Sequence, residues 1–370
     1  MSSRKAPFSL SRREFVRKTS SLVAVGTGTA WVREVLSAPV DSPRQVGAAP
    51  KDSPSMAGEV VRSFDFKSPS ELGDTSANGY LANVGCTKGN MGAGLPVIDS
   101  QGMRFDIPSN NGANPSGAWF ANFTSDYSLF FDADCAFAIE VETKWSGGLL
   151  TANFRDISSP GAPQGGIKLF DVTAGDIRGG PNMQRRDGRT HYYSSSDAKV
   201  VVQTYYQKGF PIVYRYWDAS DSGLYEGPTP AGQLLLENQV QGCTYPQVHT
   251  DSETCFFIQP DTWMRWRLEI THGPRGTALF RSYGIQAPAW LDSTVKLFGA
   301  VSGQPLRILV DWNPKTLGYA PLWMGNDGGT QTGKVWLFPY MTNCAPQPHP
   351  LWSVWYRNLK IIKISGGSQR

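Results

Sequence analysis

The chain has few charged residues, few cysteines and no long apolar run, and each shortage excludes a class of protein. Asp, Glu, Lys and Arg together make up 18% of its 370 residues, below the value of about a quarter that is usual for soluble domains. The five cysteines form no CxxC pair and no Cys/His cluster with zinc spacing, which argues against a structural zinc site. The apolar run at 22–32 is far shorter than the about 20 residues of a membrane-spanning helix.

Strong helical periodicity and internal repeats are also missing, whereas glycine (39) and proline (26) are plentiful. Apolar residues instead alternate with polar ones in short runs that are separated by turn signals. The predicted strands are 60–66, 102–107, 117–123, 136–145, 165–172, 199–206, 211–217, 255–258, 263–271, 294–301, 305–311, 333–340 and 352–364. About a dozen strands without helical spacers predict an all-β jelly roll, a β-sandwich of two antiparallel sheets.

The first forty residues have the character of an export signal. Residues 11–18, SRREFVRK, resemble the twin-arginine export motif, a mildly apolar run follows, and Leu36-Ser37-Ala38 is a candidate cleavage site. We therefore expect a signal peptide at 1–38 and a periplasmic or secreted protein that does not span the membrane. A Pro, Ser and Gly-rich linker is expected at 39–59, before a single jelly-roll domain at 60–366.

The charge of the chain is concentrated in that signal. Residues 1–38 hold seven Lys or Arg and two Glu, a net +5, while the whole chain is +4, so the remainder is close to −1. A nearly neutral body has no overall field to attract polyanions, which argues against nucleic acid as a partner. Any acidic ligand must be met by a local cluster.

The cysteine spacing favours one disulfide in an oxidising compartment. Cys243 and Cys255 are close in sequence and are the first candidates for a bond. A bond between Cys86 and Cys135 is a further alternative, and Cys344 has no evident partner. The odd count leaves at least one buried free thiol.

Residues 199–217, KVVVQTYYQKGFPIVYRYW, read as two strands joined by a turn. Gln203 and Tyr205 fall on one face of the first strand, opposite Val200 and Val202. This composition predicts a sheet with one apolar face and one face of aromatic and hydrogen-bonding groups, suited to a sugar chain. We expect Gln203, Tyr205, Arg215 and Lys168 to share that second face.

Several longer segments carry a resemblance to a family. They are GAWFANFTSDYS (117–128), GGIK (165–168), VVVQTYYQKGFPIVY (200–214), LLLENQVQGCTYP (234–246), CFFIQPDTWMRWRLEI (255–270), VSGQPLRILVD (301–311) and GKVWLFPYMTNCAPQPHPLWSVWYRNLKI (333–361). Together they resemble uncharacterised concanavalin A-like jelly-roll proteins of bacteria and phages, over roughly 60–364. The resemblance implies the fold and no activity, and Arg357 stands where such proteins often have an acid.

More distantly, the layout is similar to alginate and glucuronan lyases of the same fold. In these enzymes a Gln, Asn or Arg neutralises the sugar carboxylate and a Tyr or His moves protons, without an obligatory metal. Gln247-Val248-His249 matches a three-residue motif of alginate lyases, while their Arg-rich and Tyr-rich motifs are absent. The resemblance implies a polysaccharide partner, uronate-containing in the lyase version.

The residue types that β-elimination needs define the candidate site. The candidate catalytic residues are Gln203, Tyr205, Arg215 and His249. The candidate substrate-binding residues are Lys168, Tyr214, Trp217, Arg265 and Trp323. No metal ligand set and no cofactor is predicted. A structural calcium ion stays open, because 218–223 and 327–329 carry suitable oxygens without EF-hand spacing.

Two other functions stay open at this stage. A glycoside hydrolase could use Glu140 and Glu142, which share a strand face with Cβ atoms roughly 7 Å apart. A lectin-like module would bind sugars without cleaving them, through stacking side chains. Candidates for stacking are Trp119, Trp217, Trp312, Tyr319 and Trp323.

Overall fold

The computed structural model describes the parts of the chain that form the domain. The described residues are 55–76, 82–88, 94–108, 117–124, 129–151, 167–174, 183–184, 190–191, 199–205, 210–216, 235–236, 256–280, 285–317, 321–323, 332–339, 350–366 and 368–369. The expected signal peptide at 1–38 lies outside them. All that follows concerns the unit formed by residues 50–370.

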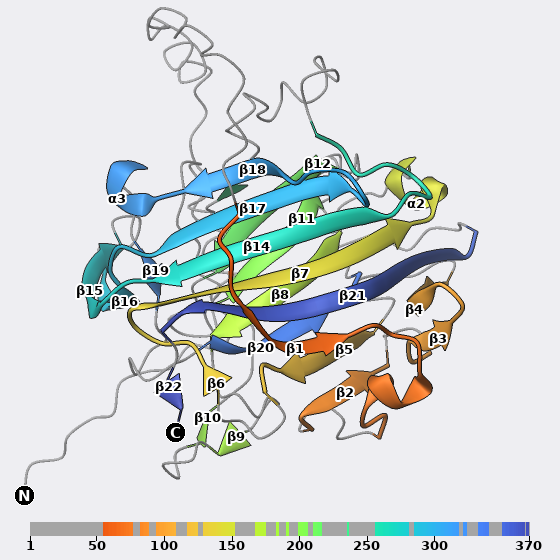
Figure 1. The fold of residues 1–370 in the computed structure, drawn as a ribbon, viewed down its shortest axis with the longest axis horizontal. Coiled ribbons are helices and arrows are strands. Elements are labelled where there is room, and N and C mark those ends of the chain that lie inside the picture. Colours follow the sequence, from red (N-terminus) through yellow and green to blue (C-terminus); the bar gives the residue numbers. More distant parts are fainter. Residues whose placement is uncertain are drawn as a thin grey trace, which may run out of the picture. The chain divides into compact units, whose positions relative to one another are not determined.

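One large sheet, sheet A, is built around the long strands β7 and β21 (Figure 1). Its order is β18 (Arg307–Trp312), β17 (Thr294–Val301), β14 (Met264–His272), β7 (Cys135–Trp145), β21 (Trp352–Ser365), β4 (Gly102–Ile107) and β3 (Val97–Asp99). β1 (Glu59–Phe64) pairs with the same edge of β21 as β4, farther along the strand. Every pair in the sheet is antiparallel.

The second sheet, sheet B, contains the strand pair singled out in the sequence. Its order is β13 (Leu235–Leu236), β12 (Phe210–Tyr216), β11 (Lys199–Tyr205), β8 (Lys168–Ala174), β20 (Thr332–Leu337), β5 (Ala118–Asn122) and β2 (Val84–Thr87). These pairs are antiparallel as well. In Figure 1 sheet B lies behind sheet A.

The two sheets bury their inner faces against each other. In sheet A, Phe137, Ile139 and Val141 alternate along β7 and belong to the core; in sheet B, Val172 and Val335 do so. Tyr356 of β21 joins the layers directly, since its Oη donates to the backbone oxygen of Leu169 at 2.7 Å. The protein is therefore an all-β jelly-roll sandwich of two antiparallel sheets, which confirms the predicted fold class.

Most predicted strands are present within a few residues of their expected bounds. The segment 256–258 is an exception, because it carries no strand in the structure. Two strands that the sequence pattern did not predict, β15 (Arg275–Phe280) and β16 (Ile285–Trp290), form a small sheet with β19 (Leu322–Trp323). Two more short pairs, β9–β10 (Met183–Gln184, Thr190–His191) and β6–β22 (Leu129–Phe130, Ser368–Gln369), complete the described strands.

Helical structure is confined to short connections. They are the 3-10 helix η1 (Pro69–Leu72), α2 (Gly147–Thr151) and α3 (Pro314–Leu317). Within the described residues no helix has the length and apolar character needed to cross a membrane.

A bulge in β21 sets which side chains face the core. Before it, Val354 and Tyr356 point inward; beyond it, Leu359 and Ile361 do, so the alternation changes phase. The extra residue is Asn358, whose φ of 53° is the left-handed conformation that Asn tolerates better than most residues. The bulge lets Lys360 emerge on the outward face beside Glu140.

Cys86 and Cys135 are both buried free thiols, so the alternative of a bond between them is wrong. The Sγ of Cys86 donates to Leu72 O at 3.1 Å, and that of Cys135 donates to Asp132 O at 2.7 Å. Burial raises the pKa of each thiol to about 12. The favoured pair, Cys243 and Cys255, lies outside the described residues and stays a prediction.

His272 lies at the end of β14 inside the sandwich. Its ring stacks on Trp290, with centroids 3.9 Å apart and planes 2° apart, and its Nδ1 lies 2.9 Å from Asp132 O. Burial lowers the pKa of His272 to about 4, although Asp132 acts in the opposite direction. The imidazole is therefore neutral in the folded protein at neutral pH.

This histidine predicts a loss of stability in acid. The unfolded chain binds a proton at His272 below a pKa of 6.5, whereas the folded chain does so only near 4. Stability should therefore fall as the pH drops from 6.5 to 4, by about 3 kcal/mol from this residue. Urea unfolding at pH 7 and pH 4 should show the stability difference between wild type and His272→Gln shrinking by that amount. Parallel pH curves for the two proteins would contradict the prediction.

Candidate functional site

The register of sheet B places most of the predicted site positions on one face. Gln203 pairs with Lys168 of β8 and with Ile212 of β12. Tyr205 is two residues from Gln203 on the same strand and therefore lies on the same face. Tyr214 pairs with Val201, which is also two residues from Gln203, so its position lies on that face as well. Directly opposed residues of an antiparallel pair share a face, so these positions lie on the face of sheet B that is turned away from the core.

Arg215 is separated from them by the same register. It pairs with Val200, which is 5% exposed and belongs to the apolar core. The expectation that Arg215 shares a face with Gln203 and Lys168 is therefore wrong. The reason is the register of the two strands, in which Tyr205 pairs with Phe210. In this register Tyr214, rather than Arg215, falls on the same face of the sheet as Gln203.

Three buried polar side chains extend this face across the next two strands. Asn122 of β5 and Lys334 of β20 are direct partners in the ladder, and Asp171 of β8 is the partner of Trp336. All three are at most 1% exposed, although they lie on the face away from the apolar core. Burying charged and amide groups is costly unless they have partners, and for the amide of Asn122 the described residues supply none.

The side-chain amide of Asn122 is buried without the hydrogen bonds that a purely structural residue would make. Its side chain is completely buried, yet neither its Nδ2 nor its Oδ1 has a hydrogen-bond partner. An unsatisfied buried amide costs about 1–3 kcal/mol. A group that destabilises the folded protein in this way is characteristic of a position kept for a ligand.

Aromatic rings line the same face beside the lysines. The Nζ of Lys334 lies 4.4 Å from the ring centroid of Phe120 and 5.3 Å from that of Trp336. The Nζ of Lys168 lies 5.7 Å from the ring of Phe338. A cation over an aromatic face is attracted by the ring, and in a weakly polar setting the attraction between opposite charges is stronger than in water.

Asn122, Asp171 and Lys334 were not among the candidates drawn from the sequence. The signal that could have identified them is one polar residue inside otherwise apolar, aromatic runs: Asn122 in AWFAN and Lys334 in GKVWLF. Which strands stand side by side is a property of the topology, so their meeting was not readable from the chain alone.

Several predicted residues cannot be placed in the site. Trp217 and His249 lie outside the described residues, as do 218–223 and 327–329. For Gln203, Tyr205, Tyr214, Arg215 and Trp323 only the backbone is described. Their roles stay predictions.

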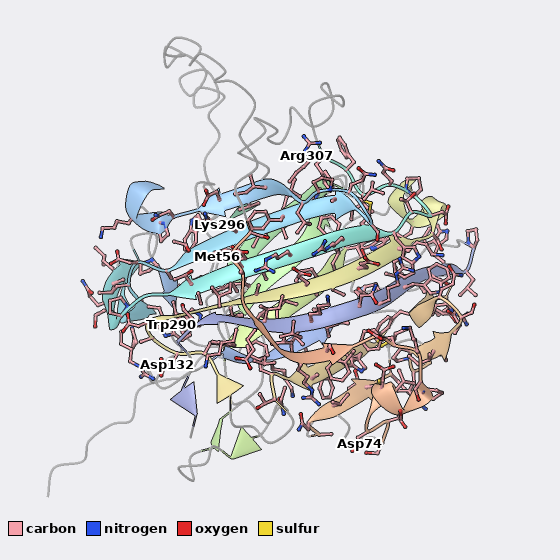
Figure 2. The ribbon with its side chains drawn as sticks, in the orientation of Figure 1. Met56, Asp74, Asp132, Trp290, Lys296 and Arg307 are labelled. Carbon is pink, nitrogen blue, oxygen red and sulfur yellow. The ribbon has the colours of Figure 1, made fainter. Side chains whose placement is uncertain are left out.

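Arg265 lies on the outward face of the other sheet. Its Nη2 donates to Glu140 Oε2 at 3.0 Å, and the neighbouring Arg267 donates from Nη1 to Glu140 Oε1 and from Nε to Glu269 Oε1, each at 2.6 Å. The backbone N–H of Met56, which lies over sheet A (Figure 2), donates to Glu269 Oε1 at 3.0 Å, and Arg267 donates to the backbone oxygen of Met56. Arg265 is thus not brought together with Gln203 and Lys168.

Glu142 is held in a comparable way at the next outward position of β7. Its carboxylate accepts from Arg357 Nε at 2.7 Å, from Ser302 Oγ at 2.8 Å and from Asn358 Nδ2 at 3.3 Å. Arg357, which replaces the acid expected from the family resemblance, is therefore the ion-pair partner of Glu142.

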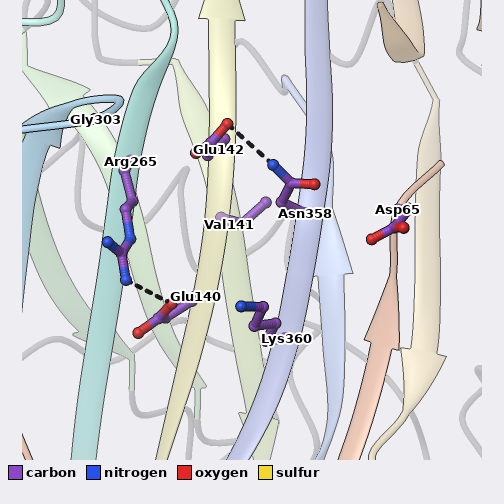
Figure 3. A pocket seen from close by; sticks show the side chains of 8 residues that line it. All are labelled: Asp65, Glu140, Val141, Glu142, Arg265, Gly303, Asn358 and Lys360. Carbon is purple, nitrogen blue, oxygen red and sulfur yellow. Dashed lines mark hydrogen bonds and ion pairs between the residues drawn. The ribbon is translucent and has the colours of Figure 1, made fainter. Parts of the chain in front are cut away.

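These contacts disfavour the glycosidase reading of Glu140 and Glu142 (Figure 3). Burial acts to raise the pKa of Glu140, but the hydrogen bonds and charges of Arg267 and Arg265 outweigh it and leave that pKa below its usual value. A glycosidase acid needs the opposite shift, since it must stay protonated to donate to the leaving oxygen. Both carboxylates instead serve the ion-pair network of sheet A.

Metal ligands do not gather in the part of the chain that the structure describes. No group of three or more His, Cys, Asp or Glu side chains there is arranged to hold a metal ion.

Breaking the buried network should cost far more than breaking an exposed pair. Arg267→Met leaves Glu140 and Glu269 without their shared partner, and we expect a loss of about 3–5 kcal/mol in the free energy of unfolding. Lys296→Met is the control on the same sheet, since the Lys296–Asp311 pair is 3.7 Å long and partly exposed. It should lose less than about 1 kcal/mol in urea unfolding. Equal losses for the two variants would contradict the prediction.

Comparison with known proteins gives a similarity of fold. No protein-family model and none of the curated proteins matches the chain. Among solved structures, an alginate lyase from Chlorella virus has 15% identity and a TM-score of 0.45, covering 82% of this chain and all of that one. An alginate lyase from Aplysia kurodai (12%, TM-score 0.41) covers 82% and 99%. A glycoside hydrolase family protein from Mycobacterium thermorestibile (11%, TM-score 0.39) covers 82% and 100%. At these identities the similarity concerns the fold alone.

Proposed function

We propose that this protein is an exported, polysaccharide-active protein that binds an acidic glycan on the outer face of sheet B and cleaves it by β-elimination. The observation that carries the proposal is the buried amide of Asn122, which has no partner and stands opposite Lys334 in the ladder. An amide and an ammonium group side by side can bind one carboxylate by hydrogen bonds and charge together.

β-Elimination from a uronic acid depends on that neutralisation. The proton at C5 of the sugar becomes removable only when the negative charge that develops on its carboxylate side is stabilised. Asn122 would donate its N–H groups to the carboxylate, and Lys334 would supply positive charge. Both groups are already desolvated, because each is at most 1% exposed, so no solvent needs to rearrange during the reaction.

Proton transfer falls to groups nearer the strand pair β11–β12. Tyr205 and Tyr214 stand on the same face by register, and a tyrosine can take the C5 proton and pass one to the leaving oxygen. Gln203 and Lys168 are opposed in the ladder and suit hydroxyl and carboxylate groups of neighbouring sugar units. No step of this scheme requires a metal.

The site of action follows from the N-terminal motif. The twin-arginine-like segment 11–18 supports export to the periplasm or beyond, where polysaccharides of the envelope and of the surroundings are accessible. The nearly neutral body of the chain leaves recognition of an acidic glycan to the local cations on sheet B.

A panel of acidic and neutral polysaccharides distinguishes this proposal from its rivals. A lyase forms unsaturated uronides, which absorb in the ultraviolet, together with new reducing ends. A hydrolase releases reducing ends without that absorbance, and a lectin-like module binds without product. Uronate polymers should give the absorbance and neutral polymers should not; binding of uronate polymers without product would assign the protein to the lectin class.

Asn122→Leu separates activity from stability. Because the amide is unsatisfied in the folded protein, replacing it with an apolar group of similar size should keep or raise Tm. Lyase activity should nevertheless fall by about 100- to 1,000-fold, as for the loss of one donor to a developing charge. Thermal melting and initial rates measure the two effects, with Lys296→Gln on sheet A as the control. Unchanged rates in Asn122→Leu would remove the basis of the proposal.

A further inference from the structure

A pocket on the outward face of sheet A lies on the other side of the sandwich from the site proposed above. Its volume is about 410 Å³, in the lower part of the usual range of about 300–1,000 Å³ for small-molecule pockets. It is lined by Asp65, Glu140, Val141, Glu142, Arg265, Gly303, Asn358 and Lys360 (Figure 3). The volume is sufficient for a ligand with one sugar ring.

Three adjacent strands, one turn and Asp65, the residue after β1, build this pocket. Glu140 and Glu142 come from β7, Arg265 from β14, and Asn358 and Lys360 from the two sides of the bulge in β21. Gly303 belongs to the turn after β17; its φ is +86°, and a side chain there would meet nothing within 4 Å. The turn thus leaves the mouth of the pocket open.

The charges around the pocket leave one cation in excess. Glu140, Glu142 and Glu269 form ion pairs with Arg265, Arg267 and Arg357, and Asp65 pairs with Lys67. Lys360 stands apart from this set, because no hydrogen bond or ion pair within the described structure engages its ammonium group. The charged lining residues alone sum to −1, and adding the ion-pair partners Glu269, Arg267, Arg357 and Lys67 brings the net charge of the site to +1.

The hydrogen-bonding groups of the pocket are of both kinds. Arg265 uses only its Nη2 on Glu140, and 39% of its side chain is exposed, so further N–H groups are free to donate. Glu140, Glu142 and the Oδ1 of Asn358 can accept. Lys360 and Arg265 can together bind one anionic group, and the oxygens around them can accept hydrogen bonds from hydroxyl groups. This combination matches a ligand that carries one carboxylate and several hydroxyls.

We propose that this pocket binds a sugar acid of about one ring, with its carboxylate on Lys360 and Arg265 and its hydroxyls on Glu140, Glu142 and Asn358. The proposal does not depend on the chemistry assigned to sheet B, because the pocket shares no residue with that site. It gives the protein a second, non-catalytic ligand site on the opposite sheet.

Calorimetric titration of the full chain with glucuronate tests the proposal, with glucose and acetate as comparison ligands. Glucuronate should bind saturably. Glucose, which lacks the charge, and acetate, which lacks the hydroxyls, should each bind at least about tenfold more weakly. Added salt should weaken the binding of glucuronate and leave that of glucose unchanged.

Variants assign the binding to this pocket. Lys360→Gln should weaken glucuronate binding about tenfold or more without a change in Tm, because the ammonium group makes no hydrogen bond or ion pair to the described residues that the variant would lose. Asn358→Gly keeps the left-handed backbone and should weaken binding less. Lys363→Gln on the same strand should leave the affinity unchanged.

Three outcomes would overturn the proposal. They are the absence of saturable glucuronate binding, an unchanged affinity in Lys360→Gln, and a loss of affinity confined to Asn122→Leu. The last result would place the sugar acid on sheet B and would support the lyase site while removing this one, so the two proposals fail separately.

Discussion

The contact between the inner faces of the two sheets holds every other feature in place. Large side chains from sheet A, such as Trp266, Phe137 and Tyr356, pack against Trp119, Val172 and Val335 of sheet B in one apolar core. Burial of that apolar area is the main favourable term in folding. Because the inner faces are mainly apolar, each sheet can carry charged and amide groups on its other face, and both proposed sites lie there.

The two outer faces use their polar groups in opposite ways. On sheet A the carboxylates of Glu140, Glu142 and Glu269 are satisfied by arginines, and the backbone of Met56 completes the network. On sheet B the amide of Asn122 is left without a partner. Satisfied networks rigidify a fold, whereas unsatisfied groups are tolerated where a ligand completes them. This contrast is the reason why we propose the glycan site on sheet B rather than on sheet A.

Much of the fold was predictable from the chain, because alternation of apolar and polar residues reports directly on strands. The run around β7 alternates regularly, and the prediction that Glu140 and Glu142 share one strand face is confirmed, since both line the same outward pocket. β15 and β16 were missed because Gly276, Pro288 and several small residues weaken the pattern of alternation. The prediction of a strand at 255–258 is wrong for 256–258, because apolar residues alone do not establish a strand.

The site was less predictable, for a reason that lies in register and topology. Arg215 was placed on the wrong face because a strand pair shifted by one residue exchanges its faces. Asn122 and Lys334 are more than 200 positions apart in the chain, and only the order of strands in sheet B makes them neighbours. Composition can suggest which residue types are present, but not which of them meet.

The bulge at Asn358 makes the C-terminal strand unusually sensitive to changes of length. Without the extra residue, the two halves of β21 would follow one continuous alternation of faces. Either Leu359 and Ile361 or Val354 and Tyr356 would then point to solvent instead of into the core. A substitution along this strand changes one side chain, but the deletion of one residue would exchange the inward and outward side chains of half the strand. Homologues of this chain should therefore vary in residue type across this strand while keeping its length constant.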